Sequence, residues 1–330
     1  MTATSTLARR ELVLPAPRGP LSEWVLHHLR GERTGRPGVA LTADPFDDDL
    51  QLALYCCYES HYSDLPQVER DVEWDVELLS FRSNLECAFE LGLRDAVAGV
   101  PTNGAARELI PAMIAADTGP SLSSYMEARG TLAQMREFVV HRSAYQLKEA
   151  DGHTFGIPRL DGTAKQLLVE IQAGEYGADG HDRRMHATLF AQTMRELGLD
   201  DRPHAYLDVL PGSALAISNV ISLFGLNRRW RGALVGHLTV FEMTSVVPMG
   251  RYARALERLG ASPAARRFYD VHVLADAEHE VVALDMAEAY TAAEPEGLAD
   301  VLFGAGCAIA AEDRFARRLL EGWGDGRDAR

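Results

Sequence analysis

The stretch YDVHVLADAEHEV, residues 269–281, carries His272, Asp276 and His279 at spacings of four and three residues. At about 100° per residue, these three side chains project within a sector of about 60° around a helix. The rest of the circumference is largely apolar, which predicts a buried helix. Unpaired polar groups are costly in such a place, so the stripe needs partners. These partners are either protein groups or metal ions.

Helical periodicity extends over most of the chain around this stretch. Apolar residues recur at i, i+3, i+4 and i+7. The predicted helices cover residues 21–32, 47–62, 73–97, 121–150, 163–175, 181–198, 213–225, 229–247, 249–259, 264–290 and 294–320. The β-branched runs are short and lack hairpin turns between them. The sequence therefore predicts an all-α protein: a single helical bundle with an N-terminal helical extension. We expect a flexible N-terminal arm over residues 1–20, the extension packed on the core over 21–115, and the core bundle over 116–330.

Composition excludes several classes of partner. The 330 residues carry a formal charge of −15, which argues against nucleic acid and against anionic membrane surfaces. No apolar run is long enough for a transmembrane helix or a signal peptide. The four cysteines show no CxxC spacing, which is typical of a protein from a reducing compartment. We expect a cytoplasmic protein with a small-molecule substrate, and a homodimer remains an open option.

Further polar residues lie within apolar helical segments and could meet the stripe. These are Glu149, Glu175, His186 and Glu242. Three imidazoles with three or four carboxylates form a ligand set that suits iron or manganese. A single iron needs only two histidines and one carboxylate, so the extra groups favour two metal ions. The paired Glu-x-x-His motif of ferritin-like bundles is absent, and neither HEXXH nor cysteine spacing supports zinc.

Each of these residues also has a purely structural interpretation. The stripe could be a satisfied network of Asp–His hydrogen bonds. Glu175 could be a helix-end carboxylate that faces water. Candidate ion-pair partners are Arg142 or Lys148 for Glu149, and Arg229 or Arg231 for Glu242.

Several stretches resemble a known family when they are taken together. HRSAYQLKEADGH, LLVEIQAGEYG with MHATLF, LVGHLTVFEMTS and FYDVHVLADAEHE resemble the iron-containing redox enzymes of the haem-oxygenase-like di-iron oxidase superfamily. The resemblance runs from roughly residue 130 to residue 320. The N-terminal part looks like the extension of longer members. The resemblance implies a haem-oxygenase-like helical bundle.

The resemblance also implies a ligand set for iron. In the family a first core helix supplies a Glu, a second supplies a Glu and a His, and a third supplies His, Asp and His. The matching residues here are Glu149; Glu175 and His186; and His272, Asp276 and His279. Some members instead use a Glu about thirty residues before the first His of the last helix, a place that Glu242 occupies. Glu149 and Glu242 are therefore two candidates for one role, with Glu149 slightly preferred.

The chemistry that the resemblance implies is O₂-dependent. Members hold two iron ions, use O₂ as co-substrate with an external electron donor, and N-oxygenate amines or oxidatively cleave C–C bonds in amino or fatty acids. We expect an oxidase or oxygenase of a small metabolite, an amine-bearing amino acid, with Arg142, Tyr145 and Tyr269 near the substrate or the ligands. One alternative is a haem-binding or non-catalytic ligand-binding bundle. Another is a thiaminase-like hydrolase, which would need a nucleophilic cysteine in the pocket.

Overall fold

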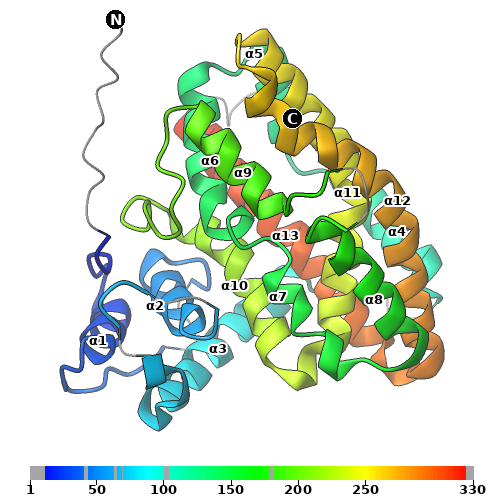
Figure 1. Ribbon diagram of the computed structural model, residues 1–330. Coiled ribbons are helices and arrows are strands. Elements are labelled where there is room, and N and C mark those ends of the chain that lie inside the picture. The colour runs from blue at the N-terminus through cyan, green and yellow to red at the C-terminus, as the bar shows by residue number, and fades with distance from the viewer. Residues whose placement is uncertain are drawn as a thin grey trace, which may run out of the picture.

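The computed structural model describes residues 12–40, 44–62, 65–68, 70–99, 104–178 and 182–324, so residues 1–11 of the predicted arm lie outside the described residues. All regular secondary structure in these ranges is helical, which confirms the all-α prediction (Figure 1). The α-helices are α1 Pro20–Leu29, α2 Asp48–Glu59, α3 Val76–Ala96, α4 Ala106–Ala116, α5 Leu122–Arg129, α6 Leu132–Gln146, α7 Asp151–Thr154, α8 Gly162–Glu175, α9 His186–Glu196, α10 Gly212–Leu226, α11 Arg231–Arg258, α12 Pro263–Ala293 and α13 Leu298–Gly322. Four 3-10 helices join some of these described elements: η1 Arg70–Trp74, η2 Ile157–Arg159, η3 Arg228–Trp230 and η4 Pro295–Gly297. None of the described helices is both long enough and apolar enough to cross a bilayer.

The longest of the described helices are α11, α12 and α13, and α11 lies between the other two (Figure 1). α11 packs along both of the others. Where α11 crosses α13, a Cβ atom on Gly236 would lie 1.8 Å from the carbonyl oxygen of Val301. A Cβ atom on Gly304 would lie 1.9 Å from the carbonyl oxygen of Ala233. Only glycine permits backbones to approach this closely, and the contact fixes α11 against α13.

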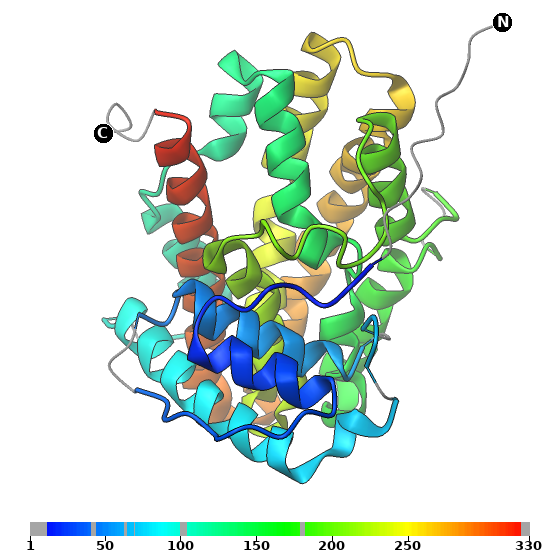
Figure 2. The ribbon, with the colours of Figure 1, turned by 90° about the vertical axis from the view of Figure 1, so that its left-hand side faces the viewer.

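The first three helices lie together at one end of the molecule (Figures 1 and 2). α1 and α3 pack on α2, and α2 packs on α10. Buried aromatic residues of these helices, such as Trp24 and Phe81, belong to the same apolar core as Phe138 of α6. The last residue of α2, Glu59, is paired with Lys148 in the turn after α6. The N-terminal helices therefore contact the core directly beside Glu149.

Several helices differ from the sequence-based prediction. The helix expected over 121–150 is broken into α5 and α6 at Gly130, because Thr131 caps α6 in a capping box with Gln134. The two helices expected over 229–247 and 249–259 are one, α11, with Pro248 inside it. An internal proline costs about 3 kcal/mol, which the extensive packing of α11 outweighs. The fourth helix, α4, was not predicted.

Candidate metal centre

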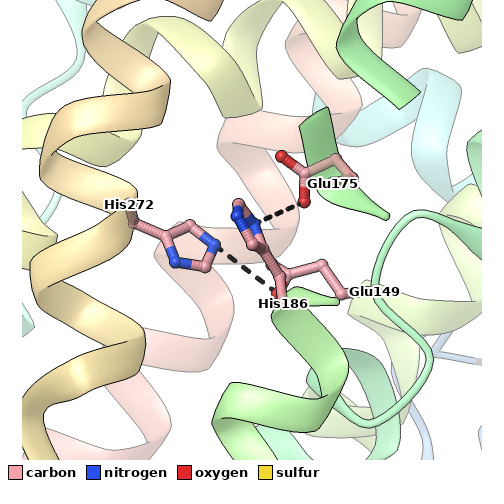
Figure 3. A group of neighbouring side chains, drawn as sticks. All are labelled: Glu149, Glu175, His186 and His272. Carbon is pink, nitrogen blue, oxygen red and sulfur yellow. Dashed lines mark ion pairs between the residues drawn. The ribbon is translucent and has the colours of Figure 1, made fainter. Parts of the chain in front are cut away.

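All seven predicted metal ligands converge between α6, α8, α9, α11 and α12, and all are buried. They form two overlapping groups, in each of which one potential ligand atom per residue lies within 4.8 Å of the others. The first group is Glu149, Glu175, His186 and His272 (Figure 3), and the second is Glu175, Glu242, Asp276 and His279. Glu175 belongs to both groups. The arrangement is that of two sites with one shared carboxylate.

The end of α8 brings two of these ligands together. Glu175 is the last residue of α8, and Gly177 adopts a φ of +86°, which favours glycine. A Cβ atom on Gly177 would lie 2.9 Å from backbone carbons of Arg183 and Arg184, so the returning chain passes very close to it. α9 then begins at His186, whose Nδ1 lies 2.8 Å from Oε2 of Glu175 (Figure 3). Gly177 therefore permits the tight turn that brings His186 next to Glu175.

α12 presents the third set of ligands with a defined ring orientation. The Ser262 hydroxyl caps the helix by accepting a hydrogen bond from the Ala265 amide at 3.1 Å. One turn before His272, the carbonyl of Phe268 accepts a hydrogen bond from Nδ1 of His272 at 2.8 Å. That bond leaves the Nε2 lone pair of His272 free to bind a metal, and Nε2 lies 3.5 Å from Oε2 of Glu149.

Glu149 and Glu242 approach the centre from different elements. Glu149 lies in the turn after α6, between Lys148, which is paired with Glu59, and Ala150, which has a φ of +76°. A left-handed conformation at a non-glycine residue stores strain, as is common at functional sites. Glu242 lies within α11, and its Oε2 is 3.4 Å from Nδ1 of His279. The family resemblance gave Glu149 and Glu242 as two candidates for one metal ligand. The structure instead places Glu149 in the first group and Glu242 in the second.

Several buried ligand atoms lack a hydrogen bond of good geometry among the described residues, although the three histidines lie within ion-pair distance of carboxylates. These atoms are Glu149 Oε2, His186 Nδ1, His272 Nε2, Asp276 Oδ2 and His279 Nδ1. Leaving buried polar atoms unpaired is costly, and a cation within each group would satisfy them. The four carboxylates can supply four negative charges, which match two divalent ions. The residues therefore fit a pair of metal ions with oxygen and nitrogen ligands.

Two of the structural interpretations of the same residues are wrong. The proposed partners are paired elsewhere: Arg142 with Glu312, Lys148 with Glu59, Arg229 with Glu90, and Arg231 with Glu294. Glu175 does not face water, because only 7% of its surface is exposed. The Asp–His network is only partly satisfied: each histidine lies 2.8–3.5 Å from a glutamate carboxylate, whereas Asp276 Oδ2 has no hydrogen-bond partner among the described residues.

The carboxylates strongly favour protonation of two of the histidines. Burial acts to lower the pKa of His272, but the negative charge of Glu149 outweighs it and raises the pKa to about 10. Burial likewise acts to lower the pKa of His279, whereas hydrogen bonds to Glu175 and Glu242 raise it to about 11. A metal ion entering the centre must therefore displace protons.

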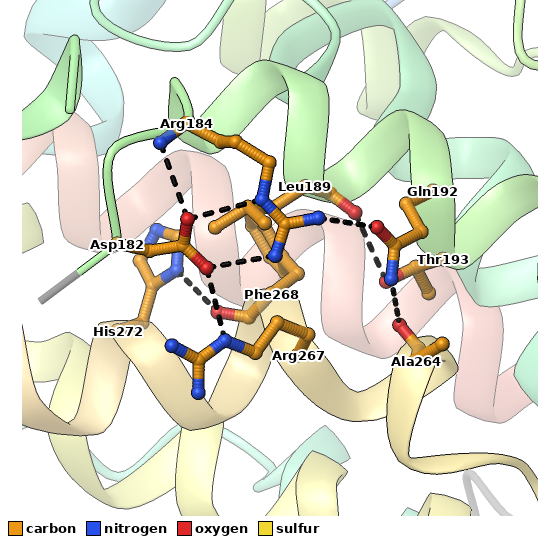
Figure 4. A network of polar contacts seen from close by, with 9 residues as sticks. All are labelled: Asp182, Arg184, Leu189, Gln192, Thr193, Ala264, Arg267, Phe268 and His272. Atoms are coloured by element: carbon orange, nitrogen blue, oxygen red, sulfur yellow. Dashed lines mark hydrogen bonds and ion pairs between the residues drawn. The ribbon is translucent and has the colours of Figure 1, made fainter.

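A polar network outside the ligand set joins α9 to α12 (Figure 4). Oδ2 of Asp182, in the segment before α9, accepts hydrogen bonds from Arg184 at 2.7 Å and from Nε of Arg267 at 3.0 Å. Two more bonds run from Gln192 Nε2 to the Ala264 carbonyl (2.9 Å) and from Thr193 Oγ1 to the Ala265 carbonyl (2.8 Å). Asp182 precedes His186 by four residues, and Arg267 precedes His272 by five. Sequence reasoning missed this network, because nothing local links positions so far apart.

A cavity of about 250 Å³ reaches the ligands. Its lining includes predicted ligands such as Glu149, Glu242 and His272 and further polar residues such as Asp117, Arg142 and Glu312. Aromatic residues make up another part of the lining: Phe138, Tyr145, Phe241, Tyr252 and Tyr269. Arg142, Tyr145 and Tyr269, which the sequence placed near the substrate or the ligands, all line it. Burial, followed by the charge of Glu149, raises the pKa of Tyr145 well above its ordinary value, so its phenol stays protonated.

Two solved structures are similar to about two thirds of this chain. Both are of a CADD-like protein of unknown function from Nostoc punctiforme PCC 73102, at 2.00 and 1.35 Å resolution. They have TM-scores of 0.53 and 0.50 and identities of 16% and 15%. The matches cover 66% and 67% of this chain and 96% of theirs, which shows a shared fold.

Comparison of the sequence with known proteins identifies the family of this chain. Over 118 residues the chain is 26% identical to the nitrosourea synthase of Streptomyces achromogenes subsp. streptozoticus, which is 36% of this chain and only 25% of that protein. Residues 136–313 match the family described as iron-containing redox enzyme. That match covers more than half of the chain and contains all seven predicted ligands. The chain therefore belongs to the family of haem-oxygenase-like, iron-containing redox enzymes.

Proposed function

We propose that the protein is an O₂-dependent, non-haem di-iron oxidase or oxygenase that acts on a small amine-bearing amino acid. The observation that carries the proposal is the pair of buried four-residue groups that share Glu175. When bound there, two iron ions supply the capacity to activate O₂, with electrons from an external donor. Either N-oxygenation or oxidative C–C cleavage is compatible with this site.

The side chains around the centre perform the remaining tasks. The carboxylates offset the positive charge of the ions, and the Phe268 carbonyl holds the ring of His272 in one tautomer. The aromatic walls exclude water from the space beside the ligands. The distant relative is named for a product with an N-nitroso group, which favours a nitrogen-bearing substrate.

The rival functions receive less support from the same geometry. Four of the seven buried groups are carboxylates, which suit hard metal ions rather than a haem iron with its His, Cys, Met or Tyr axial ligands, and this disfavours haem. A thiaminase-like hydrolase needs a reactive cysteine, and none of the four lines the cavity. Burial also raises the pKa of Cys57 to about 12, so that thiol is unreactive.

Anaerobic titration with Fe(II), followed by exposure to O₂, tests the proposal. We expect two ions per chain and a transient visible absorbance after O₂ is admitted. Asp276→Ala should abolish the transient, whereas Asp285→Ala, on the exposed face of the same helix, should preserve it. One ion or none in the unmodified protein, or an unchanged transient in Asp276→Ala, would contradict the proposal.

A further inference from the structure

An ion pair that is not among the predicted iron ligands forms part of the cavity wall. Arg142 of α6 donates to Glu312 of α13 through both terminal nitrogens, Nη1 to Oε1 at 2.6 Å and Nη2 to Oε2 at 2.5 Å. The Arg142 side chain is 12% exposed and that of Glu312 is 34% exposed. The guanidinium carbon lies 5.6 Å from the ring centroid of Phe138 and 4.4 Å from that of Phe315. The rings and the carboxylate hold the guanidinium in one orientation.

This pair still has hydrogen-bonding capacity of both kinds. A guanidinium has five N–H donors, and Glu312 takes two from Arg142. A carboxylate accepts about four hydrogen bonds, and Arg142 supplies two to Glu312. A ligand that carries both a carboxylate and an ammonium group could therefore bind beside the pair without breaking it.

Groups of both charges lie around the cavity near Arg142 and Glu312. Asp117 and Asp313 also line the cavity, Asp313 is paired with Arg317 at 2.8 Å, and Arg251 donates to Ser121, which lines the cavity as well. A ligand that carries both a carboxylate and an ammonium group can therefore find a partner of opposite charge for each, whereas a ligand with one charged group can use only one of them.

Unpartnered groups in the same cavity indicate that a polar ligand is accommodated. Tyr269 is 1% exposed, Gln146 is 4% exposed and Gln172 is 2% exposed, and all three line the cavity. Tyr269 Oη, Gln146 Oε1 and Gln172 Nε2 have no hydrogen-bond partner among the described residues. Buried polar atoms of this kind are normally satisfied, here by water or by polar atoms of a ligand.

The position of Arg142 on α6 indicates the extent of such a ligand. Arg142 precedes the last residue of α6, Gln146, by one helical turn or about 6 Å, and Glu149 follows in the turn after the helix. Tyr145 and Gln146 lie on the same side of α6 as Arg142 and also line the cavity. A charged head beside Arg142 therefore leaves room for an unbranched chain that extends towards the predicted ligands.

We propose that Arg142 and Glu312 form the subsite for the zwitterionic head of an α-amino acid whose extended side chain points towards the metal centre. This subsite rests on the proposed function, because it takes the cavity beside the metal ligands as the substrate site. Arg142 receives the carboxylate of the substrate, and Glu312 receives its ammonium group. The side chain of the amino acid, rather than its head, is then the part presented for oxidation.

Binding of three matched ligands tests the subsite without requiring turnover. Norleucine carries both charged groups, hexanoate lacks the ammonium group, and pentylamine lacks the carboxylate. Calorimetric titrations use metal-free protein and, anaerobically, Fe(II)-loaded protein. We expect norleucine to bind at least about tenfold more tightly than either analogue. Binding of hexanoate within about threefold of norleucine, or no detectable binding of norleucine in either form, would overturn the proposal.

Substitutions of Glu312 test whether the Arg142–Glu312 pair is responsible for the preference for norleucine. Glu312→Gln should weaken norleucine binding at least about tenfold while leaving hexanoate binding unchanged or tighter. Glu127→Gln is the matched control, because Glu127 pairs with Arg254 at 2.6 Å on the surface and does not line the cavity. Thermal unfolding verifies that each variant is folded, and Glu312→Asp, which keeps the charge, should retain the preference for norleucine. Unchanged norleucine binding in folded Glu312→Gln would refute the subsite.

The proposed function can fail separately from the subsite. Iron stoichiometry is measured on the same protein samples. Norleucine selectivity without iron binding would retain the subsite and refute the di-iron function. Two bound ions without norleucine selectivity would do the reverse.

Discussion

Asp182 and Arg267 join the segment before α9 to the first half of α12, with Nε of Arg267 3.0 Å from Oδ2 of Asp182. This contact connects the backbone that carries His186 with the backbone that carries His272. The two imidazole rings lie side by side, with centroids 4.1 Å apart. We expect the spacing of the two rings to depend on this contact between the segments that carry them.

Asp182→Asn should weaken iron binding in the group that contains His186. The variant loses the charge that attracts both Arg184 and Arg267, so α9 can shift relative to α12. We expect about a tenfold loss of affinity for one of two ions, the lower end of the range for groups that orient ligands. Fe(II) titration should show the second ion unchanged. Asp285→Asn, which breaks a comparable but exposed contact between α12 and Arg107, should leave both affinities intact.

Iron affinity should rise with pH. The pKa values of His272, about 10, and of His279, about 11, mean that both imidazoles carry protons at neutral pH before iron enters. Binding must release these protons, so each displaced proton improves affinity by up to about tenfold per pH unit. Titration between pH 6.5 and 8.5 in weakly buffered solution, with proton release recorded, measures this. An affinity that is independent of pH would show that the histidines are already neutral.

A second pair of buried histidines predicts loss of stability in acid. Nε2 of His153 lies 3.1 Å from Nδ1 of His237, and burial lowers the pKa of His153 from 6.5 to about 4. The unfolded chain therefore binds a proton at a higher pH than the folded protein does. The contribution of His153 to stability is present above pH 6.5 and is lost as the pH falls towards 4. The loss amounts to at most about 3 kcal/mol.

His153→Gln isolates this effect, because glutamine keeps a hydrogen-bonding group near His237 but does not titrate. Denaturant unfolding of the metal-free protein at several pH values should give a flatter dependence for the variant between pH 6.5 and 4. Parallel curves for the two proteins would show that His153 is not held neutral by the fold.

Local periodicity predicts most of this fold, and it fails where tertiary contacts decide. The break at Gly130 depends on a capping box formed by Thr131 and Gln134, a signal weaker than the surrounding helical pattern. The continuation of α11 through Pro248 depends on packing against α12 and α13, which no local rule contains. α4 escaped prediction because it contains Pro111 and fully buries only Ala106 and Ile110.

The candidate site was predictable to a similar extent. Regular spacing on one helix identified His272, Asp276 and His279. The spacing of residues along the chain cannot reveal that Glu175 belongs to two groups of potential ligands. From the sequence, Glu149 and Glu242 are therefore alternatives for one ligand position. The pairing of Arg142 with Glu312 spans 170 residues and has no signature in either segment. Residues that lie far apart in the sequence and meet at the site can be identified only from the three-dimensional structure.

The shared position of Glu175 predicts different outcomes for three glutamate variants. One of its oxygens lies 2.8 Å from Nδ1 of His186, and the other lies 3.5 Å from Nδ1 of His279. Glu149→Ala and Glu242→Ala should each reduce iron binding from two ions to one, because each removes a ligand from one group only. Glu175→Ala should reduce the affinity for both ions, since it removes a ligand from each.

Iron analysis of the three purified variants after anaerobic loading measures these stoichiometries. Glu170→Ala, an exposed position on the same helix as Glu175, is the control and should retain both ions. If Glu149→Ala and Glu242→Ala both keep two ions, neither residue is a ligand. If Glu175→Ala loses only one ion, its carboxylate serves a single site, and the two groups are independent centres rather than one.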